Sequence, residues 1–157
     1  MSGIETRYIY RAKELQMGKF VYGAYLKFLP YTPYPVGDKH IPETDYKHLI
    51  ITEGFSDWGL PRELKVYEID PDTLGQCTGI KDKNGNLIYE GDIVKFNYDT
   101  VEIKAVVSWD NKDLIGFYLN ATDYFKDKYV SDYDFYKNDY EIIGNIYKNP
   151  ELLEVSK

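Results

Sequence analysis

Short runs of alternating apolar and polar residues, separated by turn-forming residues, dominate this sequence. In residues 101–110, Val101, Ile103, Ala105, Val107 and Trp109 alternate mostly with polar or charged neighbours. Because side chains two apart in a strand point to the same face, this run predicts a strand with one buried face. We expect Trp109 to lie in the interior with Val107 and Ile103.

The same reasoning predicts a chain that is mainly β, with little helix. The pattern predicts a hairpin over residues 7–28, and its strand over 19–28 carries one plainly apolar face. That face consists of Phe20, Tyr22, Ala24, Leu26 and Phe28. Further strands are expected at residues 8–10, 46–52, 64–69, 87–90, 93–98, 114–119 and 140–147.

Turn-forming residues divide these strands. Asn84-Gly85 predicts the tip of a two-residue hairpin with Gly85 at positive φ. Asp70-Pro71-Asp72 is a turn signature. Residues 75–81 contain glycines and a lysine without the spacing of a phosphate-binding loop, and we expect a turn there. The four prolines in residues 29–45 predict a proline-rich surface loop.

Residues 124–140 are consistent with two local structures. Aromatic side chains recur there at helical spacing, but several Asp, Asn and Ser residues are weak helix formers, which favours a loop with a helical turn. The aromatic rings form a candidate partner surface, or alternatively cap the open end of a small barrel. The candidate surface residues are Tyr124, Phe125, Tyr129, Tyr133 and Tyr136.

Composition supports a small globular β protein. The 157 residues suit one domain or two small halves, and 17 tyrosines favour half-buried strand surfaces. The net charge of −7 argues against direct binding to nucleic acid. The amino-terminal residues lack an apolar run and no segment has the apolar length of a membrane span, so we expect a cytoplasmic protein without contact to a membrane.

Residue types that carry chemistry are few and scattered. One cysteine, Cys77, excludes an internal disulfide, and we expect it to be a small buried apolar residue. The two histidines, His40 and His48, flank a proline and share no helix face, which argues against a zinc site. We therefore expect no catalytic residues, no metal and no cofactor.

Two groups of carboxylates and amides suggest chemistry but have simpler explanations. Glu90 and Asp92 could share a strand face for acid–base work, yet Gly91 between them suggests a bulge in which Asp92 binds local backbone amides. Asp82, Asn84 and Asn86 have the spacing at which a calcium loop begins, but the glycine and glutamate that such a loop requires are absent.

Several blocks of this sequence resemble the YopX family of phage and prophage proteins. The longest covers residues 69–95, from Ile-Asp-Pro-Asp-Thr-Leu-Gly to Tyr-Glu-Gly-Asp-Ile-Val-Lys, and contains one departure, Cys77, where the family has an aromatic residue. Val107-Ser108-Trp109-Asp110 and residues 142–152 are similar to the family's later blocks. Tyr10-Arg11-Ala12-Lys13 and residues 18–23 are similar to its opening hairpin.

The resemblance implies a β-rich amino-terminal portion over residues 1–70, followed over 71–157 by an SH3-like β-barrel. It also implies a phage or prophage gene expressed in a bacterial host, but it implies no activity and no functional residue. From the residues, we expect a non-catalytic protein-interaction module that binds a host or phage protein, with homo-oligomers as one form. The alternative is an acidic mimic that occupies the nucleic-acid site of a host enzyme.

Overall fold

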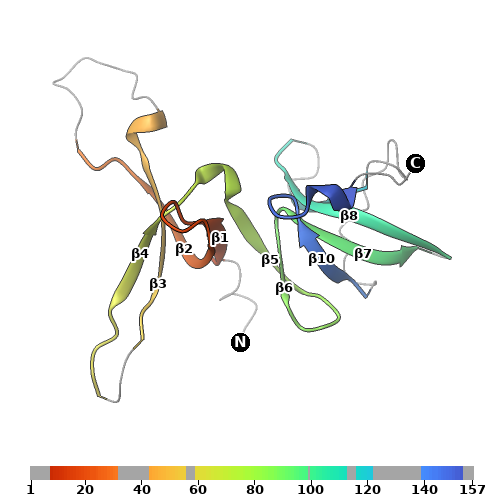
Figure 1. Ribbon diagram of the computed structural model, residues 1–157, viewed down its shortest axis with the longest axis horizontal. Helices are drawn as coiled ribbons and strands as arrows, with labels where there is room; N and C mark the ends of the chain where they lie inside the picture. The colour runs from red at the N-terminus through yellow and green to blue at the C-terminus, as the bar shows by residue number, and fades with distance from the viewer. Residues whose placement is uncertain are drawn as a thin grey trace. The chain divides into compact units, whose positions relative to one another are not determined.

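The computed structural model describes residues 8–31, 43–55, 59–98, 100–112, 116–121 and 139–153. These residues are mainly strand and form two antiparallel sheets, with three short 3-10 helices and no α-helix among them (Figure 1). The chain divides into two compact units between Leu74 and Gly75. The family resemblance implied a boundary after residue 70.

The amino-terminal unit contains four neighbouring antiparallel strands of the first sheet. Its strands are β1 (Tyr10–Lys13), β2 (Phe20–Phe28), β3 (Lys47–Glu53) and β4 (Leu64–Glu68). Each strand pairs with the next along the chain. The 3-10 helix η1 (Glu43–Asp45) precedes β3, and η2 (Pro71–Thr73) follows β4 at the predicted Asp-Pro-Asp turn.

The plainly apolar face predicted for β2 is not the face that packs against the core of this unit. The core of this unit contains Ala12, Ile50 and Ile69, and the β2 residues packed against it are Val21 and Tyr25. The opposite set includes Tyr22 and is partly exposed. Both faces of β2 carry apolar residues, so alternation alone does not determine which one is buried; the packing of β1 and β3 determines it.

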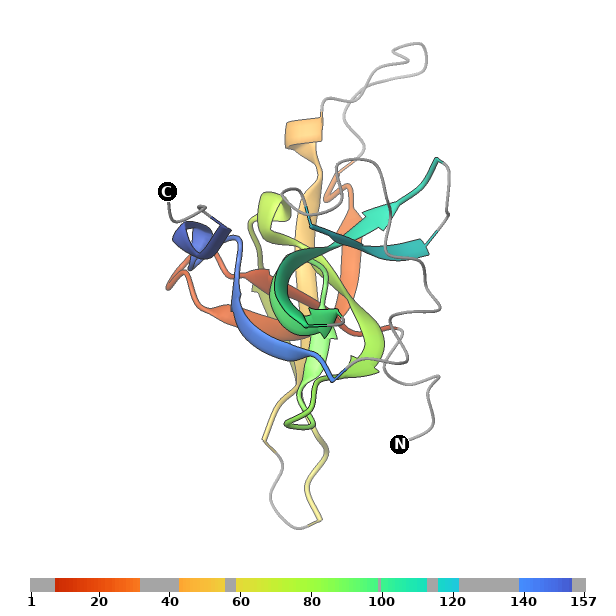
Figure 2. The ribbon, with the colours of Figure 1, turned by 90° about the vertical axis from the view of Figure 1, so that its right-hand side faces the viewer.

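The carboxy-terminal unit contains a hairpin and a second sheet. The hairpin consists of β5 (Gly75–Lys81) and β6 (Leu87–Tyr89). The sheet has the order β10-β7-β8-β9, from β7 (Asp92–Tyr98), β8 (Val101–Asp110), β9 (Gly116–Asn120) and β10 (Glu141–Asn145). The last described element is η3 (Pro150–Leu153). In Figure 2, β10 (blue) runs beside β7 (green).

The core of this unit confirms most of the predicted alternation. Ile103, Ala105 and Val107 of β8 are buried together with residues of the neighbouring strands. The prediction for Trp109 is wrong, because its side chain is 43% exposed. Trp109 shares the face of Val107, but it is the second-last residue of β8 and lies beyond the packed centre of the strand. Its ring contacts the Phe117 ring edge to face.

Two local predictions in the β5–β6 hairpin need correction. Residues 75–81 form strand β5 rather than a turn, with an irregular register between Cys77 and Lys81. The hairpin loop is also longer than predicted: the Gly85 amide donates to the Asp82 carbonyl, and the Asp82 amide donates to the Asn86 carbonyl. Lys83 and Asn84 are therefore the central turn residues. Gly85 follows them at φ +85°, which confirms its predicted positive φ.

Candidate functional site

An apolar surface on the amino-terminal sheet is the most prominent candidate site. The face opposite the core exposes Tyr22, Leu26, Leu64 and Val66 by 48, 42, 68 and 56% of their surface. Leu49 and Ile51 of β3 lie between them and are half-buried. We call these six residues the open face.

Strand pairing brings the open face together. Leu26 is opposite Leu49, and Ile51 is opposite Val66, so their side chains point to the same side of the sheet. Leu64 is opposite Glu53 further along the same face. Strand β4 is the edge strand of this sheet in the part of the chain that the structure describes, and its apolar side chains have the highest exposure on the face.

Ion pairs border the open face at its two ends. Lys47 Nζ lies 2.7 Å from Glu68 Oε2 at one end. At the other end, Arg62 forms an ion pair with Glu53. An apolar centre with a charged rim is the usual anatomy of a protein–protein interface. The four charges sum to zero, although the whole chain carries −7.

The hairpin of β3 and β4 extends the apolar surface beyond the sheet. β2 pairs with β3 as far as Ile51, whereas β3 and β4 continue to pair as far as Glu53 and Leu64 (Figure 1). Beyond these residues Phe55 is 88% exposed and Leu60 is 65% exposed. A two-stranded ribbon is marginally stable by itself, so its exposed apolar residues favour a partner.

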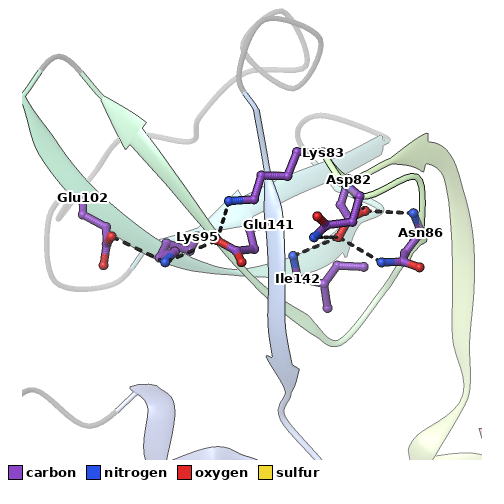
Figure 3. Close-up of polar contacts among 8 residues, drawn as sticks. Asp82, Lys83, Asn86, Lys95, Glu102, Glu141 and Ile142 are labelled. Carbon is purple, nitrogen blue, oxygen red and sulfur yellow. Dashed lines mark hydrogen bonds and ion pairs between the residues drawn. The ribbon is translucent and has the colours of Figure 1, made fainter.

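A charged pocket of about 140 Å³ lies on the carboxy-terminal sheet. It is lined by Lys83, Lys95, Phe96, Asn97, Glu102, Asp139 and Glu141. Glu141 Oε2 binds the ammonium groups of Lys83 and Lys95 at 2.8 and 3.3 Å, and Lys95 lies 3.7 Å from Glu102 (Figure 3). Lys83 and Lys95 lower the pKa of the Glu141 carboxyl. Each of these four charges therefore already has an opposite charge beside it.

Asp82 connects the β5–β6 hairpin to β10 beside this pocket. Its carboxylate accepts hydrogen bonds from the backbone amides of Asn84 and Asn86 at 2.9 and 2.8 Å, and from that of Ile142 at 3.4 Å (Figure 3). Burial raises the pKa of Asp82, but the hydrogen bonds from Asn86, Ile142 and Asn84 outweigh it, so the net shift is downward. This carboxylate organises a hairpin and is not arranged as a calcium ligand.

A polar cluster that the sequence did not reveal surrounds His48. The Tyr25 hydroxyl is hydrogen-bonded to His48 Nδ1 at 2.7 Å, and His48 Nε2 lies 3.6 Å from Glu43 Oε1. Lys27 forms an ion pair with Glu43. Burial raises the pKa of the Tyr25 hydroxyl, and Lys27 offsets part of this effect. A raised pKa leaves less of the nucleophilic phenolate form of Tyr25 at neutral pH.

Residues 90–92 and Cys77 have the structural roles that the sequence predicted for them. Asp92 is buried and accepts a hydrogen bond from the Tyr89 amide at 2.8 Å, while Gly91 has φ +83°, which confirms the expected local bonding. Burial raises the pKa of Glu90, although the backbone amides of Gln76 and Trp109 oppose the shift. Cys77 is 1% exposed, as expected.

The candidate surface of Tyr124, Phe125, Tyr129, Tyr133 and Tyr136 lies outside the described residues, as does His40. Tyr140, at the end of the same aromatic stripe, is buried against Phe96 with ring centroids 5.2 Å apart. Within the described ranges, no group of three or more His, Cys, Asp or Glu side chains could hold a metal ion. Those ranges also contain no helix long and apolar enough to cross a membrane.

The described residues define a two-unit antiparallel β protein. It has an apolar open face and polar clusters whose charged groups already have partners. The chain belongs to the YopX family, whose model, described as YopX protein, matches residues 9–154. This confirms the resemblance seen in the sequence. No curated protein matches the chain.

A solved structure supports the fold. The crystal structure of protein EF1440 from Enterococcus faecalis is similar at 21% identity and a TM-score of 0.51. The match covers 92% of this chain and 96% of that chain, so both units are included. At this identity, the similarity concerns the fold alone.

Proposed function

We propose that this YopX-family chain is a non-catalytic protein-interaction module that binds a protein through the open face. The carrying observation is the exposure of four large apolar side chains, Tyr22, Leu26, Leu64 and Val66, on one side of a folded sheet. Contiguous apolar surface of this kind is costly in water and marks interaction sites.

The setting of this module is a bacterial host that carries the phage or prophage, and the protein acts in the host cytoplasm. Residues 71–157 form a small, rigid SH3-like barrel, which is the second domain of the module. This part of the proposal follows the family resemblance and the arrangement of short antiparallel strands in the second unit.

The polar clusters support a role in binding rather than in catalysis. Glu141 and Lys95 neutralise each other in the charged pocket, and the Asp82 carboxylate is occupied by backbone amides. Paired lysines also weaken the case for an acidic nucleic-acid mimic, because such a mimic needs continuous rows of negative charge.

In-cell photo-crosslinking tests the proposal. A photoreactive phenylalanine analogue replaces Tyr22 on the open face and, as a control, replaces Tyr8, which is 69% exposed but lies outside that face. Both proteins are expressed in the bacterial host and irradiated. We expect a discrete crosslinked protein species at position 22 and none at position 8. The absence of any protein crosslink at position 22 would overturn the proposed function.

A further inference from the structure

We infer that the outer edge of β4 binds an extended segment of the partner protein, which adds to the sheet as a further strand. The segment that fits this edge has apolar residues at alternate positions and an acidic residue between them. This inference rests on the proposed function and specifies how the partner is held.

The backbone groups of β4 point alternately towards β3 and away from it. Just before β4, the Glu63 carbonyl accepts a hydrogen bond from the Gly54 amide at 2.7 Å. Just after β4, the Ile69 amide donates to the His48 carbonyl at 2.9 Å. Because this direction alternates along an antiparallel strand, the odd-numbered residues of β4 bond to β3. The even-numbered residues direct their N–H and C=O groups to the outer edge.

Leu64, Val66 and Glu68 are the even-numbered residues of β4. The Glu68 carbonyl accepts a hydrogen bond from the Leu15 amide at 3.0 Å, which agrees with a carbonyl that points away from β3. Within the described ranges, no strand pairs with this side of β4, and no backbone hydrogen bond reaches Leu64 or Val66 from it. The outer edge therefore offers the N–H and C=O groups of both residues to a partner.

An extended backbone is the structure whose groups match this edge. Its own N–H and C=O groups recur at the same spacing as those of β4. In recognition by strand addition, these backbone bonds give affinity and the alternate side chains give specificity. The side chains of Leu64 and Val66 are exposed on the open face, so they would pack against alternate apolar side chains of the added segment.

Lys65 determines which charge the segment should carry on its other face. The Lys65 side chain lies on the face opposite Leu64 and Val66, is exposed, and forms no ion pair with another described residue. Its neighbour on β3 is the uncharged Thr52. An added strand places one residue beside Lys65 on the free side, and a carboxylate there forms a cross-strand ion pair. The segment is therefore apolar, acidic and apolar at consecutive positions.

A second copy of β4 fits this edge less well. Only one antiparallel pairing matches Leu64 and Val66 of one copy with the same open residues of another, with each Leu64 opposite a Val66. That pairing also sets Lys65 opposite Lys65. Like charges directly opposite each other destabilise a strand pair, whereas an acidic residue at that position stabilises it. The edge thus favours a segment of a different protein.

Amide hydrogen exchange of the purified chain, followed by NMR, tests whether the edge is open. After correction for intrinsic rates, the amides of Leu64 and Val66 should exchange at least about tenfold faster than those of Lys65 and Tyr67, which bond to β3. Equal exchange of the four amides would overturn the inference. Protection of Leu64 and Val66 that increases with protein concentration would assign the edge to a second copy, and would also overturn it.

Val66→Pro, combined with the photoreactive residue at position 22, tests the added strand. Proline removes an outward N–H without removing a hydrogen bond to β3. The matched control Val66→Thr retains that N–H and the branched side chain. We expect at least about tenfold less crosslinked partner with Val66→Pro, because a missing donor interrupts the ladder, and little change with Val66→Thr. Circular dichroism and thermal unfolding check that both variants fold.

A charge reversal at Lys65 tests the acidic residue of the segment. Lys65→Glu should reduce the crosslinked partner about two- to fivefold, because it places like charges together across the strands. The control Lys65→Arg retains the positive charge and should crosslink like the unmodified side chain. Lys65 is exposed, so both variants should fold even if Val66→Pro does not.

The outcomes separate this inference from the proposed function. A crosslink at position 22 that is equally strong in folded Val66→Pro and Val66→Thr, or in Lys65→Glu and Lys65→Arg, would overturn the added strand. It would leave the interaction module intact. The absence of a crosslink at position 22 when residues 65 and 66 are unchanged would overturn the proposed function, and the added strand with it.

Discussion

The Asp92 carboxylate accepts a hydrogen bond from the backbone amide of Tyr89 at 2.8 Å, and both side chains are buried. The bond spans the Glu90-Gly91 corner between β6 and β7. Gly91 adopts φ +83° there, and its amide donates to the carbonyl of Val107 on β8. Asp92 therefore stabilises the corner that joins the hairpin to the second sheet.

Replacing Asp92 should destabilise the protein more than the replacement of a single polar residue usually does. Asp92→Ala leaves a buried amide without its acceptor, and we expect a loss of about 1–3 kcal/mol in the free energy of unfolding. Asp92→Asn retains an acceptor oxygen and should cost less. Urea unfolding of the three proteins measures the difference; equal stability of wild type and Asp92→Ala would contradict this role.

The pH dependence of stability should report on Asp82. Its pKa is lower in the folded protein than in the unfolded chain, so ionised Asp82 stabilises the fold above the unfolded value of about 4. That stabilisation is lost as the pH falls through the lower folded pKa. Asp82→Asn should therefore be less stable than wild type at pH 6, with a gap that narrows towards pH 3. A gap independent of pH, from urea unfolding at each pH, would count against this account.

Gly85 should tolerate only residues that accept a left-handed backbone. Gly85→Val at φ +85° should cost about 1–2 kcal/mol, because the branched side chain is strained in that conformation. The space around Gly85 is open, with nothing within 4 Å of an added Cβ, so the cost is conformational. Gly85→Asn should cost less. If thermal unfolding shows equal losses for Val and Asn, crowding or another effect is responsible.

The exposure of Trp109 changes the effect expected from its removal. Trp109→Ala should cost about 1–2 kcal/mol, because nearly half of the side chain is already in water. Ile103→Ala, at a buried position on the same strand face, should cost about 2–5 kcal/mol. Chemical denaturation of both variants provides the comparison, and a larger loss for Trp109→Ala would show that the strand end is more tightly packed than its exposure indicates.

Local sequence determined the features that depend on neighbouring residues. The alternation of Ile103, Ala105 and Val107 was sufficient to place these side chains in the core, because a strand has a fixed two-residue period. Gly85 could be assigned positive φ because its turn chemistry is local. The family blocks likewise lie in contiguous segments, and the family model confirms them.

The tertiary structure alone decided which faces are buried and which distant residues meet. Tyr22 and Val21 alternate on β2 with similar apolar character, and only the packing of Ala12 and Ile50 buries the side that carries Val21. Tyr25 meets His48 only because β2 pairs with β3 in one register. The open face and its ion pairs arise in the same way. Strand pairing between residues far apart in the chain sets these positions, and the two-residue period of a single strand contains no information about its partner.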